Sequence, residues 1–269
     1  MGTIWIYSIS SDIGTALAVR RLNSGWNVAG TYRTWSQQLR ELKEKGAKLV
    51  QMDATDPDSV AAASGCLVAS VGRFDECVVA LGTLEPIGQF HETPWHEWAT
   101  SISVNFTAQL HATHAALAFR KRGALVLFFA GGGTNSATER MSAYTISKVA
   151  LIKMTELLQV EIENTRFCIL GPGWVDTKIH QEVLNAGKRS GEHLSVTAAR
   201  IASQDFVPME SVLDCIDWIS TQPAEVIGGR NFSVAYDDWR SEEFAGMLRA
   251  DNELGRLRRY GNQVLNRSV

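Results

Sequence analysis

Short apolar runs alternate along the chain with longer stretches in which apolar residues recur every three or four positions. The apolar runs are typical of buried strands and lie at residues 3–7, 26–31, 48–52, 76–81, 124–130, 166–170 and 231–234. The longer stretches predict helices at residues 13–23, 36–45, 56–71, 94–120, 142–163 and 209–221. This alternation predicts an α/β fold: a doubly wound parallel sheet of Rossmann type, with about seven strands and helices on both faces.

The alternation breaks once, over the polar residues 178–206. An excursion of this length usually covers a site, so these residues are expected to form a lid over the substrate. We see no repeat and no linker-like shift in composition, and therefore expect one domain over residues 1–269. Within it, residues 236–269 form a C-terminal tail whose structure the pattern determines least.

Composition narrows the class of protein. The 269 residues are 45% hydrophobic and 20% charged, with a net charge of −3, which excludes a disordered or fibrous chain and gives no basic surface for nucleic acid. The longest uncharged stretch, residues 98–119, holds too many Ser, Asn, Gln and His residues for a membrane span. Four widely spaced cysteines suggest buried thiols and no metal site, and the cytoplasm is the expected location.

In a parallel sheet, ligands bind beyond the carboxyl ends of the strands, and the first such turn is rich in small residues. Small residues let backbone N–H groups and a helix N-terminus approach a pyrophosphate closely. The turn therefore predicts either a nucleotide site or an ordinary helix cap. The candidate cofactor-binding residues are Ser8, Ser10, Ser11, Asp12 and Ile13.

The second and third strands lead to Arg33 and Asp53. A guanidinium group suits the 2′-phosphate of NADP, whereas an acidic residue at that position suits the ribose of NAD. Arg33 thus favours NADP(H), with NAD as the alternative cofactor and a solvated surface arginine as the structural alternative. Asp53 could accept a hydrogen bond from an adenine amine or cap the helix that follows.

Tyr144 and Lys148 lie four residues apart on a predicted helix, so their side chains share one face. A nearby ammonium group favours a phenolate and is expected to lower the pKa of the tyrosine. Such a phenol can exchange a proton with a substrate oxygen. The pair follows a buried strand and the glycine-rich turn at residues 130–134, which favours a catalytic interpretation over a structural one.

The order of these elements resembles the short-chain dehydrogenase/reductase family in its small single-domain form. The resemblance covers most of residues 3–234 and depends on the first turn, on Asp53, on Asn105, on Tyr144 with Lys148, and on the segment 172–177. It implies that Tyr144 is the catalytic acid/base, that Lys148 lowers its pKa and holds the nicotinamide ribose, and that Asn105 bends a helix to keep a relay water. Further cofactor contacts implied by the resemblance are Gly82, Pro172, Gly173, Val175 and Thr177.

The sequence departs from the family pattern at several positions. Ser8 and Asp12 stand where the first turn usually has glycines, and the carboxylate of Asp12 must point away from the phosphates. Gly131 replaces the catalytic serine thirteen residues before the tyrosine. Thr134 or Ser136 could supply a hydroxyl in its place, or the backbone N–H groups of residues 131–133 could polarise a carbonyl.

We therefore expect an NADP(H)-dependent oxidoreductase that acts on a small polar, sugar-like substrate. The basic residues of the lid suggest that the substrate is anionic. One alternative is a catalytically impaired nucleotide-binding regulatory protein, and another is a sugar epimerase or dehydratase on the same fold. By analogy with the family, the chain is expected to form a homotetramer or homodimer.

Overall fold

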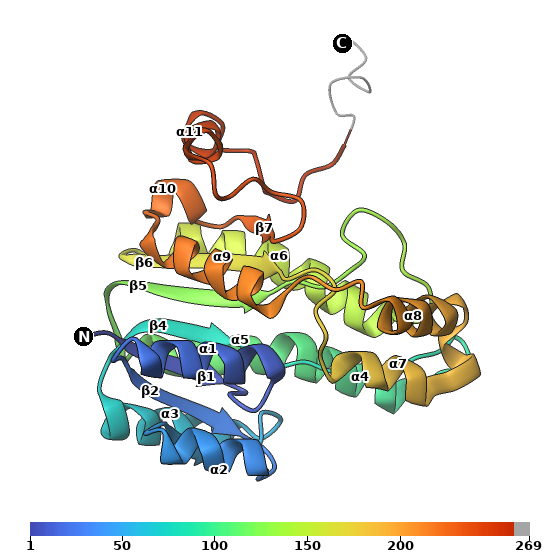
Figure 1. Cartoon of the computed structure of the whole chain (residues 1–269), viewed down its shortest axis with the longest axis horizontal. Coiled ribbons are helices and arrows are strands. Elements are labelled where there is room, and N and C mark those ends of the chain that lie inside the picture. Colours follow the sequence, from blue (N-terminus) through green and yellow to red (C-terminus); the bar gives the residue numbers. More distant parts are fainter. Residues whose placement is uncertain (261–269) are drawn as a thin grey trace.

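Seven parallel strands form the central sheet of the computed structural model, which describes residues 1–260 (Figure 1). The strands are β1 (Thr3–Tyr7), β2 (Asn27–Tyr32), β3 (Lys48–Gln51), β4 (Phe74–Val79), β5 (Arg120–Phe129), β6 (Thr165–Gly171) and β7 (Asn231–Ser233). Their order across the sheet is β3-β2-β1-β4-β5-β6-β7. The chain reverses direction across the sheet between β1 and β4, which is where a doubly wound fold binds its ligand. The predicted Rossmann-type architecture is confirmed.

Both faces of the sheet are covered, as the all-apolar strands predict. Ile4 and Ile6 of β1 pack into one core, and Trp5 and Tyr7 pack into the other, because successive side chains of a strand point to opposite faces. The first face carries α1 (Asp12–Asn23), α2 (Gln37–Glu44), α9 (Met209–Thr221), α10 (Ala224–Ile227) and α11 (Glu242–Ala250). The second carries α3 (Pro57–Val71), α5 (Ala108–Leu117) and α6 (Ser142–Glu161).

Helix starts follow local capping chemistry. The side chain of Asp56 accepts a hydrogen bond from the Asp58 N–H at 3.0 Å, and Pro57 occupies the first turn of α3, where it loses no hydrogen bond. The hydroxyl of Ser36 caps α2 in the same way, accepting from the Leu39 N–H at 3.3 Å. These caps explain why the predicted helices 36–45 and 56–71 agree closely with α2 and α3.

The single helix predicted for residues 94–120 is wrong. The structure has α4 (Trp95–Ile102), one π-helical segment η1 (Ser103–Thr107) and then α5, which ends at Leu117. Strand β5 begins at Arg120, earlier than the predicted residue 124, because Arg120 pairs with Phe74 across a register shift in β4. Periodicity alone could not show the extra residue that a π-turn inserts.

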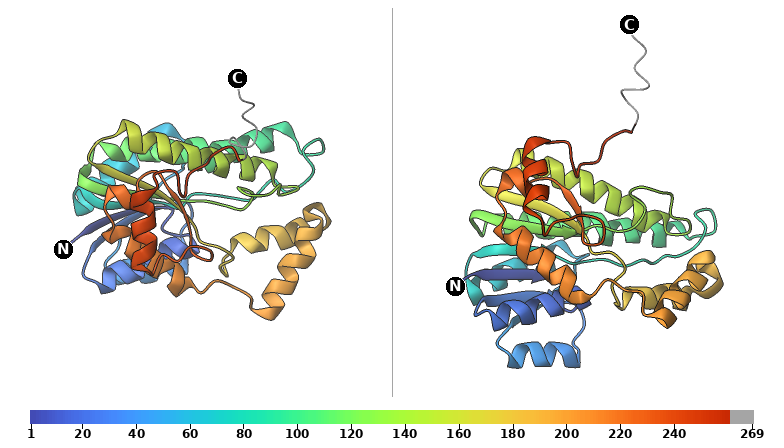
Figure 2. Two further views of the ribbon diagram at one scale, coloured as in Figure 1. Left: turned by 90° about the horizontal axis from the view of Figure 1, so that it is seen from above. Right: turned by 45° about the horizontal axis from the view of Figure 1, so that its top comes forward.

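The residues predicted to form a lid fold as two helices, α7 (Ile179–Ala186) and α8 (Glu192–Ser203), joined by the 3₁₀ turn η2 (Gly187–Ser190). They project beyond the ends to which the strand arrows point (Figures 1 and 2). This is the edge of the sheet where the candidate catalytic residues also lie.

The tail begins with ordered structure that the sequence pattern did not predict. Trp239 is 3% exposed and α11 packs into the first core. The buried guanidinium of Arg230 donates to the carbonyls of Leu248, Asp251 and Leu254 and so fixes the chain after α11. The rest of the predicted tail, residues 261–269, lies outside the described residues.

In residues 1–260, no helix is both long enough and apolar enough to span a bilayer.

Candidate active site

The first turn brings the backbone close to the start of α1. Gly14 has no room for a side chain, because a Cβ there would lie 2.7 Å from both the Ser11 hydroxyl and the Ser8 carbonyl oxygen. Ser11 caps α1 by accepting from the Gly14 N–H at 3.1 Å. Ser8 holds a left-handed backbone with φ of 65°, the conformation for which glycine is usually required. Ser10 and Ile13 complete this turn, with Ile13 packed against the first core.

The carboxylate of Asp12 contacts the base of the lid. Its Oδ2 accepts the backbone N–H of Lys178 at 2.7 Å, and its Oδ1 lies 3.3 Å from the Lys178 ammonium. The negative charge at the start of α1 is therefore held by the lid, and its orientation relative to bound phosphates stays a prediction. Asp12 also joins the first turn to the lid.

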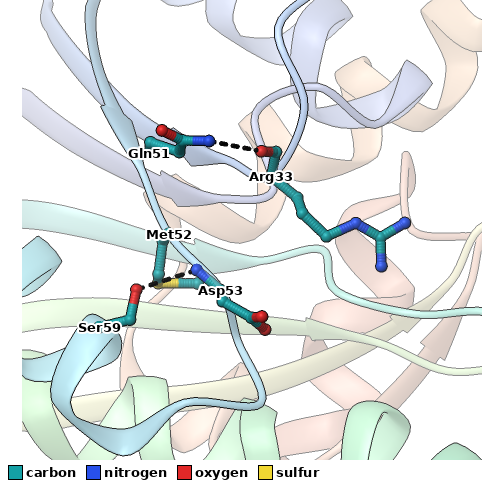
Figure 3. Close-up of a pocket in the computed structure, with 5 residues that line it drawn as sticks. All are labelled: Arg33, Gln51, Met52, Asp53 and Ser59. Carbon is teal, nitrogen blue, oxygen red and sulfur yellow. Dashed lines mark hydrogen bonds between the residues drawn. The ribbon is translucent and has the colours of Figure 1, made fainter.

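Arg33 and Asp53 line one pocket of about 330 Å³ at the ends of β2 and β3, together with Gln51, Met52 and Ser59 (Figure 3). Gln51 holds the Arg33 backbone by donating to its carbonyl at 3.1 Å, and the exposed Arg33 side chain extends away from this bond. Asp53 accepts from the backbone and hydroxyl of Thr55, and these bonds lower its pKa. The structure therefore brings together the two residues that the sequence assigned to the adenosine end of a dinucleotide.

Tyr144 and Lys148 lie on one face of α6, as predicted. Lys148 is 4% exposed, and its ammonium group donates to the Phe129 carbonyl at 2.8 Å and lies 5.7 Å from the centroid of the Tyr144 ring. Burial lowers the pKa of Lys148 to about 8, because the protein interior disfavours the charged amine.

The expected lowering of the tyrosine pKa is wrong for the chain without ligand. Burial, reinforced by the negative charge of Glu182, raises the pKa of Tyr144 to about 12. The ammonium group of Lys148 faces the ring and donates a hydrogen bond to a backbone carbonyl. Burial also lowers the pKa of Lys148 and so disfavours its charged form. Spacing on a helix places two side chains together but does not determine which electrostatic effect is larger.

Gly131, at the position of the family's serine, lies directly against Tyr144. A Cβ at Gly131 would be 2.5 Å from the phenolic oxygen and 2.6 Å from a ring carbon. The tyrosine thus occupies the space that a side chain at position 131 would need. Thr134 lies farther along the same loop and is half-buried.

Asn105 lies in the π-helical segment η1 and is fully buried. Its Oδ1 accepts the Thr83 N–H at 3.0 Å, and its Nδ2 donates to the Thr83 carbonyl at 2.9 Å. The side chain therefore holds the loop that follows β4 by both backbone groups of one residue. At Gly82, a Cβ would lie 3.2 Å from Asn105 Oδ1 and 3.9 Å from Lys148 Nζ, so these three residues meet at one point.

The sequence did not identify Glu182, which lies on lid helix α7. Its Oε2 accepts the Thr83 hydroxyl at 2.9 Å, the Leu84 N–H at 2.7 Å and the Glu85 N–H at 3.2 Å. Residues 83 and 182 are far apart in the sequence, and neither belongs to a motif. Only the tertiary structure brings them together.

The segment after β6 forms the other wall of the site. Val175 is 3% exposed, and its carbonyl accepts from the Thr177 hydroxyl at 3.3 Å and is 2.8 Å from His180 Nε2. Gly173 has φ of 78° and lies against Val207, while Pro172 precedes it at the end of the sheet. The predicted residues of this segment therefore lie at the same edge as Tyr144.

Several basic side chains of the lid have partners away from Tyr144. Lys178 contacts Asp12, Arg189 donates to the Ile87 carbonyl at 3.1 Å, and Arg200 lies 4.8 Å from the centroid of the Trp174 ring. The charged side chain that adds to the effect of burial and raises the pKa of Tyr144 is Glu182, which is acidic. No group of three or more potential metal ligands was found among residues 1–260.

Comparison with known proteins agrees with this geometry. A family model described as enoyl-(acyl carrier protein) reductase matches residues 9–235. The chain is 23% identical to serine 3-dehydrogenase of Rhizobium radiobacter over 231 residues, which is 84% of this chain and 90% of that protein. It is 25% identical to 2,3-dihydro-2,3-dihydroxybenzoate dehydrogenase of Escherichia coli (strain K12) over 182 residues, which is 66% of this chain and 71% of that protein.

Solved structures share the fold. A short-chain dehydrogenase/reductase of Saccharomyces cerevisiae superimposes with a TM-score of 0.79 at 23% identity, covering 91% of this chain and 99% of that one. An actinorhodin polyketide ketoreductase with NADPH gives a TM-score of 0.76 at 20% identity, covering 87% of this chain and 95% of that one.

Proposed function

Because this chain belongs to the short-chain dehydrogenase/reductase family, we propose that it is an NADP(H)-dependent oxidoreductase acting on a carbonyl or alcohol of a small polar, sugar-like substrate. The observation that carries the proposal is the convergence of Tyr144, Lys148 and Asn105 at the carboxyl edge of the sheet, beneath the lid. The names of the two dehydrogenase relatives denote polar substrates, which supports the proposed class of substrate.

The residues present fit a dinucleotide. The first turn leaves no room for a side chain at Gly14, and the exposed Arg33 lines the pocket at the end of β2. A bound NADP(H) would supply the hydride chemistry of the reaction. Arg33 would bind the 2′-phosphate through its fixed charge, and the turn after β1 would bind the pyrophosphate at the start of α1.

The chain's own residues would move the proton. In the direction of reduction, the Tyr144 hydroxyl donates its proton to the substrate oxygen as that oxygen gains negative charge. Lys148 lies close enough to stabilise the resulting phenolate, and its lowered pKa of about 8 would let it release and regain a proton closer to neutral pH than an ordinary lysine does. Asn105 holds the adjacent loop through Thr83. Thr134 as a substitute for the serine hydroxyl stays a proposal.

A nucleotide-binding regulatory protein is the second candidate, because Gly131 replaces the serine and the tyrosine fills its space. An epimerase or dehydratase that oxidises its substrate transiently would use the same tyrosine. Net oxidation of NADPH with a carbonyl substrate separates the proposed reductase from both.

Tyr144→Phe tests the enzyme. Removing the phenolic proton donor should lower kcat for NADPH oxidation against a panel of small polar ketones and aldehydes by at least about 100-fold. The dissociation constant of NADPH, measured by its fluorescence, should change less than about twofold. Tyr236→Phe is the control, since Tyr236 is 92% exposed. Binding of NADPH by the wild type with no turnover of any carbonyl would favour the regulatory protein.

Arg33→Ala tests the cofactor. The loss of a charged contact to the 2′-phosphate should raise the dissociation constant of NADPH about tenfold or more and leave that of NADH nearly unchanged. Arg122→Ala serves as the control. Arg122 is exposed near the start of β5, at the end of the strands opposite to their carboxyl ends. Equal losses for NADPH and NADH would remove the basis for the preference.

We propose further that the protein is a cytoplasmic homodimer or homotetramer. Leu157 and Val160 on α6 are 44% and 76% exposed, which supports an association through this helix. Sedimentation velocity of the full chain would measure the state, and a monomer at micromolar concentration would contradict it.

A further inference from the structure

The lid is closed onto the loop that follows β4. A small core of Leu84, Ile87, Met141, Val183 and Ala186 lies between the two segments, and Tyr144 packs against it. Two of these residues come from α7 and two from the loop after β4, so the catalytic candidate is covered by the same contact that closes the lid. An apolar contact of this size stabilises modestly and does not fix an orientation by itself.

Glu182 supplies the polar part of this contact. One carboxylate oxygen accepts three hydrogen bonds, from the Thr83 hydroxyl and from the Leu84 and Glu85 N–H groups. Bonds to a charged acceptor are roughly twice as strong as bonds between neutral groups. The three donors are consecutive, so the single carboxylate orders the whole turn.

This turn is also held from the opposite side. Asn105 binds the N–H and the carbonyl of Thr83, while Glu182 binds its hydroxyl. Thr83 thus joins the lid to the π-helical segment η1 through direct hydrogen bonds. Displacement of α7 would break the hydrogen bonds that the turn donates to Glu182 and would free the turn on one side.

We infer that Glu182 is a positioning residue that latches the lid onto the turn at residues 83–85 and sets the electrostatic environment of the Tyr144 phenol in the closed state. A role of Glu182 in catalysis rests on the proposed function. The latch, meaning the hydrogen bonds that Glu182 accepts from residues 83–85, can be tested without turnover. The charged and titratable groups on the segments around the phenol include Lys148 on α6, Glu139 and Arg140 before α6, Glu85 after β4, and His180, Glu182, Lys188 and Arg189 on the lid.

Among these groups, the opposite charges of Glu85 and Arg189 neutralise each other in part. Arg189 lies 3.7 Å from Glu85 and also donates to the Ile87 carbonyl. Arg140 donates to the Arg189 carbonyl at 3.2 Å. Glu182 forms no salt bridge among residues 1–260, and the next residue of α7, Val183, lies in the small core against which Tyr144 packs. Helix α7 therefore carries an unpaired carboxylate into the region of the phenol.

Two variants separate the latch from the charge. Glu182→Gln keeps an oxygen that can accept hydrogen bonds but removes the charge, whereas Glu182→Ala removes both. Hydrogen exchange of the full chain should show the Leu84 and Glu85 amides exchanging at least about tenfold faster in Glu182→Ala and less so in Glu182→Gln. Glu192→Gln on α8 is the control, because Glu192 is an exposed carboxylate of the same lid.

The electrostatic part is measured on the phenol. In protein labelled with carbon-13 at the tyrosine ζ position, with Tyr144→Phe used to assign the signal, the phenolate fraction of Tyr144 at pH 10.5 should rise at least about threefold in Glu182→Gln. If the protein turns over a carbonyl, the limb of its pH–rate profile that belongs to Tyr144 should move to lower pH in the same variant.

Unchanged exchange of Leu84 and Glu85 in Glu182→Ala would overturn the latch, and an unchanged phenolate fraction in Glu182→Gln would overturn the electrostatic role. Neither measurement requires activity. Failure of the carbonyl panel with faster exchange and a larger phenolate fraction would therefore contradict only the proposed function. If Glu182→Ala does not fold, Glu182→Gln still tests the charge, and Glu182→Asp tests the reach of the latch.

Discussion

At the scale of single residues, the position of Tyr144 depends on the absence of a side chain at Gly131. Tyr144 lies against the backbone of Gly131 because no side chain is present there. The family resemblance predicts a serine at this position, and its absence suggests lost chemistry. The structure shows instead that the space is filled by the phenol itself, so a hydroxyl cannot simply be restored.

Gly131→Ser should therefore lower activity. A Cβ at position 131 would lie 2.5 Å from the phenolic oxygen, so Tyr144 would have to move. We expect kcat to fall at least about tenfold and the free energy of unfolding to fall by about 1–3 kcal/mol, as in other overpacked sites. Steady-state kinetics and urea unfolding measure the two effects.

Gly132→Ser is the matched control, because a Cβ at Gly132 meets nothing within 4 Å. It should leave kcat and stability nearly unchanged. A Gly131→Ser protein that is more active than the wild type would mean that the serine was the missing group and that the tyrosine adapts easily.

The residue pair Tyr144 and Lys148 could be predicted because a spacing of four on a helix fixes a shared face. The sign of the tyrosine pKa shift could not, because it depends on burial beneath the lid and on Glu182, which approaches from another part of the chain. Local spacing carries information about neighbours on one element only.

At the scale of elements, the helix between β4 and β5 shows where pattern-based prediction fails. The periodicity of residues 94–120 is helical throughout, but the chain inserts a π-turn at Ser103–Thr107. That turn holds Asn105 at the loop after β4. The side-chain amide of Asn105 there forms the hydrogen bonds with the N–H and the carbonyl of Thr83. The hydrophobic pattern of a sequence does not reveal a π-turn, even where that turn positions a side chain for a tertiary contact.

Asn105→Ala should free this loop. The Thr83 N–H and carbonyl would lose their partners, which costs roughly 1–3 kcal/mol of stability because both groups are half-buried and water can reach them in part. Hydrogen exchange should show the Thr83 amide exchanging at least about tenfold faster, and thermal unfolding should show a lower Tm. Thr107→Ala in the same π-turn is the control, because the Thr107 hydroxyl is exposed and bonds only within its own turn. Equal exchange at Thr83 in wild type and Asn105→Ala would contradict the role of the two Asn105–Thr83 hydrogen bonds in holding the loop.

At the scale of the whole molecule, α6 connects the site to the C-terminal segment. Its first turns carry Tyr144 and Lys148, and farther along it Glu156 binds the arginines that follow α11. The parallel sheet of about seven strands with helices on both faces could be predicted from the repeated βα pattern, because each strand and helix carries its own hydrophobic signal. The docking of the tail could not, since it depends on ion pairs and buried carbonyls rather than on periodicity.

Glu156→Gln should loosen that docking in a pH-dependent way. The Arg258 guanidinium, helped by Lys153, lowers the pKa of Glu156 from 4.5 to about 2. A carboxyl whose pKa is lowered on folding stabilises the fold fully above its unfolded pKa and loses that contribution as the pH falls toward its folded pKa. Urea unfolding should show the variant less stable than wild type by about 1–2 kcal/mol at pH 7, and the difference should shrink as the pH is lowered from 4.5 toward 2. Glu161→Gln, an exposed carboxylate at the end of the same helix, should show no such dependence. A difference that stays constant with pH would mean that Glu156 acts through packing and not through its charge.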